Sequence, residues 1–171
     1  MTAYFRKFAL LLHIISSVGW IGAIAGFLAL AVTGLSGRDA QMVRAVYMAM
    51  VPITWIIIVP LAFASLLTGL LLSLGTKWGL FRHYWVLVKL LINLLSIIIL
   101  LLHTQIIRQV ADAAAKTAFS GADLRGSRIQ LVVAATAALL ALVTATVLSV
   151  YKPRGMTPYG WNKFKRGMRE Q

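Results

Sequence analysis

Two residues that can do chemistry lie within long apolar stretches of this sequence, His13 and Lys89. An imidazole can ligate a metal or exchange a proton, and an ammonium can pair with an anionic group. Four further residues in the apolar run of Lys89 would lie within about 40° of its direction on a helix. Together they form a polar and aromatic stripe: Trp85, Asn93, Ser96 and His103.

His13 has a comparable face of its own. Ser16, Ser17 and Trp20 follow it at the spacing that keeps residues on one side of a helix. The flank that leans the other way carries small residues: Gly19, Gly22, Ala23 and Gly26. Small residues let membrane helices approach closely, so this flank is predicted to pack against a neighbouring helix.

Composition defines the elements that must position these residues. The chain has 171 residues, 60% of them hydrophobic, and only 12% are charged, whereas a soluble domain averages roughly 25%. Four apolar runs stand out, at about 8–33, 51–74, 84–107 and 129–150, each near the ~20 residues that cross a bilayer as a helix. Lipid offers the backbone no hydrogen bonds, which makes helices the expected structure. The prediction is all-α: a single domain, 1–171, forming an integral membrane four-helix bundle.

Prolines interrupt the second run. Pro52 and Pro60 predict a local kink there, because proline lacks the N–H that a helix requires.

The distribution of basic residues predicts the orientation. With the N-terminus inside, eleven of the 17 Lys and Arg lie on the cytoplasmic side and six on the opposite side. Both termini are therefore expected to be cytoplasmic. The basic tail, residues 151–171, suits anionic lipid headgroups. Because the charges are dispersed among loops, the net charge of +13 does not indicate a nucleic-acid partner.

Other chemistries lack their residues. The chain has no cysteine, which excludes disulfides and thiolate sites. The four acidic residues fall in the predicted loops or tail, so a carboxylate-based ion carrier is disfavoured: Asp39, Asp112, Asp123 and Glu170. No nucleophile–base pair or phosphate-binding loop supports a hydrolase or nucleotide-dependent enzyme.

Depth brings the two chemical residues together. His13 and Lys89 each lie about five residues inside parallel runs, roughly 7 Å deep, while His103 lies about 21 Å further out. A site in the cytoplasmic half is therefore expected to contain His13 and Lys89 but not His103. Hydroxyl residues of the other two helices are expected to reach the same layer: Thr68, Ser73, Thr144 and Ser149.

Several strings carry a resemblance to known families. The string from Leu12 to Trp20, LHIISSVGW, resembles the first helix of the HemJ family, membrane protoporphyrinogen oxidases that bind haem b. The string from Trp85 to Leu90, WVLVKL, resembles that family's later helix. Similar patterns occur in CopD-like copper proteins. Taken whole, with LFRHYW and the ending YKPRG, the chain most resembles uncharacterised four-helix families of bacterial membrane proteins, which implies the bacterial cytoplasmic membrane.

The resemblance implies a haem b site in a redox protein or oxidoreductase subunit. His13 would be the metal ligand, Lys89 the functional, catalytic residue, and Arg82 a further cation for the propionates. Trp20, Trp85 and Asn93 would line the cofactor. The HemJ pattern also has an arginine soon after the first-helix Trp, and residues 22–32 contain none, so protoporphyrinogen oxidation itself is not carried over.

Other interpretations remain open. Lys89 can extend its ammonium to the interface without further function, and His13 can be an interfacial hydrogen-bonding histidine. Met42, Met48 and Met50 supply thioethers suited to Cu(I), which would make the protein a copper or small-solute carrier of CopD type. A structural or accessory subunit of a membrane complex is a further alternative. The partners expected under these interpretations are membrane lipid, haem or a quinone, and further copies of the chain or a larger membrane complex.

Overall fold

The computed structural model describes residues 2–75, 83–116, 124–151, 155, 157, 158, 161 and 165. The described residues form these helical elements, in chain order: α1 (Ala3–Ser36), α2 (Ala40–Pro52), the π-helix η1 (Ile53–Ile58), α3 (Val59–Gly75), α4 (Tyr84–Ala115) and α5 (Arg125–Tyr151). Four of these helical stretches, with α2, η1 and α3 counted as one, are long and apolar enough to cross a membrane. The predicted all-α membrane bundle is confirmed.

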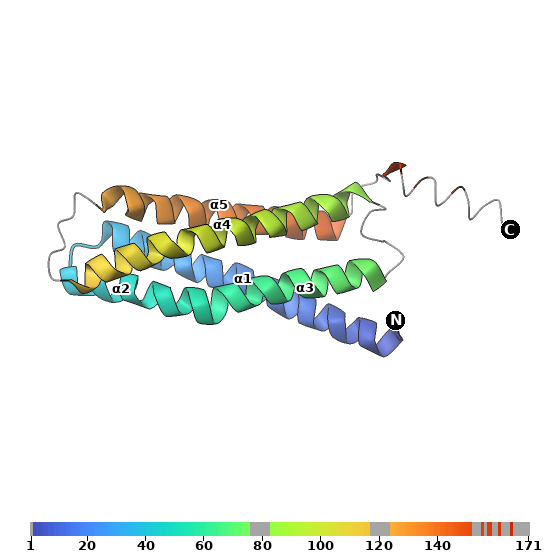
Figure 1. Cartoon of the computed structure of the whole chain (residues 1–171), viewed down its shortest axis with the longest axis horizontal. Helices are drawn as coiled ribbons and strands as arrows, with labels where there is room; N and C mark the ends of the chain where they lie inside the picture. Colours follow the sequence, from blue (N-terminus) through green and yellow to red (C-terminus); the bar gives the residue numbers. More distant parts are fainter. Residues whose placement is uncertain are drawn as a thin grey trace.

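The helices run alongside one another as four rods, one of which is the continuous α2–η1–α3 segment (Figure 1). We call the end of the bundle that carries the first residues of α1 and the last residues of α3 and α5 the proximal end (Figure 1). The opposite end, which carries the turn between α1 and α2 and the end of α4, is the distal end. At the proximal end, α1 diverges from α4 and α5 (Figure 1). The two halves of the bundle are thus packed differently.

The second span begins at Ala40, well before its expected start at Val51. The Asp39 side chain caps it by accepting hydrogen bonds from the backbone N–H groups of Gln41, at 3.1 Å, and Met42, at 3.4 Å. The third span likewise continues to Ala115, past its expected end at Ile107. Hydropathy marks the part of a helix that lipid covers, whereas capping and packing decide where the helix ends.

The expected kink near Pro52 and Pro60 takes the form of a π-helical stretch, Ile53–Ile58. Its closing bond runs from the Val59 N–H to the Thr54 carbonyl, five residues back. The Thr54 hydroxyl is fully buried and donates to the Met50 carbonyl at 2.7 Å. This wider turn accommodates Pro52 and Pro60, and α2, η1 and α3 remain one continuous helical segment.

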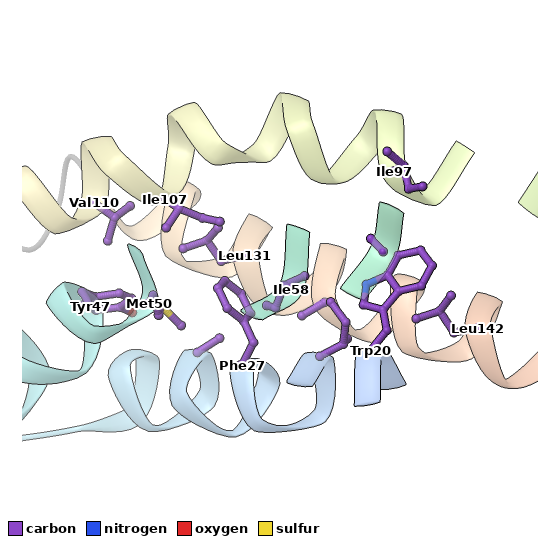
Figure 2. Packing of buried hydrophobic residues seen from close by; sticks show 14 of the residues in the cluster. Trp20, Phe27, Tyr47, Met50, Ile58, Ile97, Ile107, Val110, Leu131 and Leu142 are labelled. Atoms are coloured by element: carbon purple, nitrogen blue, oxygen red, sulfur yellow. The ribbon is translucent and has the colours of Figure 1, made fainter. Parts of the chain in front are cut away.

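One hydrophobic cluster joins all four rods (Figure 2). Aromatic side chains lie along its length, Tyr47 from α2 and Phe27 and Trp20 from α1, and aliphatic side chains from η1, α4 and α5 pack with them (Figure 2). The labelled members are Trp20, Phe27, Tyr47, Met50, Ile58, Ile97, Ile107, Val110, Leu131 and Leu142. The cluster occupies the middle and distal parts of the bundle, so the proximal end contributes little to it.

The distal end is joined by an arginine. Arg128 at the start of α5 donates from Nε to the Tyr47 hydroxyl of α2 at 2.9 Å, and from its guanidinium to the Gly34 carbonyl of α1. Arg44 of α2 donates to the Ala115 carbonyl at the end of α4, at 2.8 Å. Gly34 is required here, since a Cβ at this position would lie 2.6 Å from the Tyr47 ring. Hydrogen bonds therefore connect α1, α2, α4 and α5 at the distal end.

The small flank of α1 differs from its prediction. Gly19 contacts Leu61 of α3, at 3.3 Å from the place of its missing Cβ. Gly22 and Gly26 are exposed, and a Cβ added at either would meet nothing within 4 Å among the described residues. Their predicted packing against a neighbouring helix of this chain is therefore wrong. α1 turns a different face to the core, the one that carries Trp20 and Phe27.

Candidate functional site

His13 is the centre of a polar cluster between α1 and α3. Its Nδ1 lies 3.1 Å from the Ser65 carbonyl oxygen and 3.0 Å from the Thr68 hydroxyl. The Ser65 side chain in turn lies 2.8 Å from the Ser17 hydroxyl of α1. Two helices are thus joined by a histidine and three hydroxyl residues inside an otherwise apolar region.

The partners of His13 determine its tautomer. A carbonyl only accepts hydrogen bonds, and the Thr68 hydroxyl already has an acceptor in the Ala64 carbonyl, at 2.6 Å. Nδ1 must therefore carry the proton and donate to both Ser65 and Thr68. Within the described residues no hydrogen bond is made by Nε2, so the neutral ring presents its lone pair there. Metal-ligating histidines are commonly held in this way, with the other ring nitrogen bound to a carbonyl.

A glycine lets the imidazole lie against α3. A Cβ at position 69 would come within 3.1 Å of the His13 Cε1 atom. Gly69 therefore makes room for the ring at the point where the Ser65 carbonyl accepts a hydrogen bond from Nδ1. The position of the ring follows from α3 as much as from α1.

Lys89 approaches the same region from α4. It is half-buried, and its ammonium lies within electrostatic range of the His13 ring. Its Nζ also lies 5.9 Å from the centroid of the Trp85 ring, a cation–π distance. Asn93 donates from Nδ2 to the Lys89 carbonyl at 2.9 Å. The sequence-predicted residues His13, Lys89, Trp85 and Asn93 thus fall into one proximal region built by three helices.

Trp20 and His103 belong to another part of the bundle. Trp20 lies in the hydrophobic cluster and is 2% exposed. Both residues line an apolar cavity between α1, α4 and α5, which His13 does not line. The His103 Nδ1 lies 2.8 Å from the Ile99 carbonyl of its own helix. The stripe predicted on α4 is therefore divided between two places.

The remaining predicted residues fall into two groups. Arg82 lies outside the described residues. Ser73, Thr144 and Ser149 each donate to a carbonyl four residues back on their own helix. Ser65 was not singled out by the sequence reasoning, although its spacing of three from Thr68 placed both on one helical face.

The three methionines do not converge. Met42 and Met48 are exposed, whereas Met50 is fully buried in the core. Among the described residues, no group of three or more His, Asp or Glu side chains is placed to hold a metal ion. Neither the separated methionines nor the His, Asp and Glu side chains of the described residues favour a copper site.

A bundle of four membrane-spanning helices with a half-buried polar cluster defines this chain as a polytopic integral membrane protein. Residues 8–153 match the family described as "Predicted integral membrane protein (DUF2269)", and the chain belongs to that family. The expectation of an integral membrane protein family is thereby confirmed, whereas the resemblance to the HemJ and CopD families stays a prediction. No curated protein and no solved structure matches the chain.

Proposed function

We propose that this protein binds haem b in the proximal half of its bundle, where His13 would hold the iron, and acts as a redox protein or oxidoreductase subunit. The observation that carries the proposal is the hydrogen bonding of His13. Because Nδ1 donates to Ser65 and Thr68, the lone pair of Nε2 is available to iron.

The positive charge of Lys89 suits the propionates of haem b. Haem b carries two propionates, which need cations where water is scarce. Lys89 lies within electrostatic range of His13 and beside the Trp85 ring, so it is placed to pair with a propionate.

When bound, haem b would supply one-electron transfer. The chain's own residues do the rest. Ser65 and Thr68 hold the ring of His13 and keep its proton on Nδ1, and Lys89 would orient the cofactor by its charge.

The proposal includes a location. We assign the protein to the bacterial cytoplasmic membrane with both termini inside, on the excess of Lys and Arg at the proximal side. The proximal cluster would then face the cytoplasmic half of the bilayer. The copper-carrier alternative loses its main support, since Met50 points into the core while Met42 and Met48 are exposed.

The test is the absorption spectrum of the purified protein after expression with ample haem supply. The wild type is expected to show a Soret band and His13→Ala to lose it. His103→Ala is the matched control, because His103 is also half-buried and bonded to a carbonyl, and it should retain the band. A wild type without haem, or a His13→Ala variant with full haem content, would overturn the proposal and favour an accessory subunit.

A further inference from the structure

Arg108 presents a positive charge on the outer surface of the bundle. It is exposed in the distal part of α4, and its guanidinium makes no hydrogen bond or ion pair with the described residues. Its Cζ atom lies 5.1 Å from the centroid of the Trp55 ring of η1, a cation–π distance. The ring therefore holds the guanidinium from one side, and the N–H donors of the guanidinium are left for another partner.

The sequence of α4 places Arg108 at the boundary of the hydrocarbon region. Residues 90–107, which separate Lys89 from Arg108, contain no charged side chain. As a helix they extend about 27 Å, close to the ~30 Å thickness of the hydrocarbon core of a bilayer. The partner of Arg108 is a tryptophan, Trp55, which is a residue type enriched at membrane interfaces. Arg108 therefore lies at the level of the lipid headgroups on the distal side.

An acidic residue lies one helical turn further from the hydrocarbon region. Asp112 is exposed on the same side of α4, about 6 Å beyond Arg108 along the helix axis. Within the described part of the chain, no ion pair joins Asp112 to Arg108 or to Lys116, which caps the end of α4. The surface therefore presents a cation at the boundary and an anion outside it, each without a partner of opposite charge among the described residues.

The same face of α4 is aliphatic on the other side of Arg108. Leu101 and Leu94 lie seven and fourteen residues before it, which keeps all three on one side of the helix. Leu101 is 38% exposed and Leu94 is 44% exposed, so both meet acyl chains when the protein is in a membrane. The occupant of this face must therefore be an amphiphile, with an apolar part, then an anion, then a cation further out.

We propose that this face of α4 binds a phospholipid with an ethanolamine headgroup. Its phosphate accepts hydrogen bonds from Arg108, its ammonium donates to Asp112, and its acyl chains lie along Leu101 and Leu94. A glycerol headgroup offers Asp112 no cation, and a choline headgroup has a cation without an N–H to donate. The site shares no residue with the His13 cluster and does not depend on haem binding.

The experiment is native mass spectrometry of the full chain in mild detergent with an equimolar mixture of three phospholipids that have identical acyl chains. The three are phosphatidylethanolamine, phosphatidylcholine and phosphatidylglycerol. We expect the first bound lipid to be the ethanolamine lipid about threefold more often than either other lipid, as one exposed charge pair allows. Free phosphoethanolamine, which lacks acyl chains, should not displace the bound lipid, and displacement would overturn a lipid as the occupant.

Variants connect the result to the two charges. Asp112→Asn should remove the preference for the ethanolamine lipid over the glycerol lipid, whereas Arg108→Met should lower the binding of all three lipids by about threefold. Arg125→Met, an exposed change at the same end of the bundle, is the control and should alter neither result. His13→Ala should keep the lipid preference, which separates this test from the haem test. Equal occupancy by the three lipids, an unchanged preference in Asp112→Asn, or unchanged binding in Arg108→Met would overturn the proposal.

Discussion

The two ends of this bundle use polar residues in opposite ways. At the distal end, Arg128 is bonded to Tyr47 and Gly34, and Arg44 is bonded to Ala115, so polar contacts join four helix ends. At the proximal end, His13 joins only α1 to α3, and Lys89 approaches from α4 half-buried. The distal end is built as a scaffold, whereas the proximal end holds two half-buried titratable side chains, His13 and Lys89.

The largest effect is expected from removing the distal arginine. Arg128→Met leaves the Gly34 carbonyl and the Tyr47 hydroxyl without their donor, which should lower the free energy of unfolding by about 1.5–3 kcal/mol. Unfolding in mixed micelles of increasing sodium dodecyl sulfate measures it. Arg125→Met, an exposed change in the same turn of α5, is the control and should change stability by less than about 0.5 kcal/mol. Equal effects would mean that the distal end is not a scaffold.

A smaller loss of stability is expected at Gly34. In Gly34→Ala the new Cβ would lie 2.6 Å from a Tyr47 ring carbon, so Tyr47 must shift, and we expect a loss of about 1–2 kcal/mol. Gly22→Ala is the matched control on the same helix, since nothing within 4 Å meets its Cβ. It should gain up to about 1 kcal/mol from better helix propensity. The same unfolding assay distinguishes the two variants, and a stabilised Gly34→Ala would contradict the close packing of Tyr47 against Gly34.

At the proximal end, loss of a hydroxyl should affect binding more than folding. Thr68→Val removes one acceptor of the His13 Nδ1 proton and leaves the Ser65 carbonyl. We expect a loss of about 0.5–1 kcal/mol in stability and about a tenfold weaker haem affinity, as for other partners of ligating histidines. Haem titration of the purified protein measures the affinity. Thr144→Val, whose hydroxyl bonds to its own helix, should leave it unchanged.

The smallest effect is expected at Gly69. The change Gly69→Ala should gain less stability than Gly22→Ala, because its Cβ would lie 3.1 Å from His13. Adding His13→Ala removes the contact, and the gain of up to about 1 kcal/mol should then return. A double-mutant cycle in the unfolding assay measures this coupling. Additive changes would show that His13 does not lie against α3.

Much of the fold could be predicted from composition and hydropathy. Four apolar runs predicted four spanning helices, and those helices are present. The helix ends could not be predicted in this way, because Asp39 capping extends α2 beyond the region that lipid covers. The prolines predicted a disturbance in the second span, but only the structure decided that it takes the form of a π-helix over Ile53–Ile58.

The candidate site was predictable only in part. Helical spacing placed Lys89, Trp85 and Asn93 on one face, and depth placed His13 near Lys89. The same spacing added His103 to that face, although the structure puts His103 at the wall of a separate cavity. Spacing does not distinguish residues that share a face but meet different neighbours along it.

The sequence by itself determined that this chain is a helical membrane protein, because lipid provides no partners for an open backbone. It also determined which residues can do chemistry, since His13 and Lys89 are unusual in apolar runs. Only the tertiary structure decided that Ser65 and Thr68 orient His13, that Gly22 faces outward while Gly34 is filled by Tyr47, and that Trp20 borders a cavity. Those outcomes depend on how the helices cross, and the periodicity of one helix carries no information about the face of its neighbour.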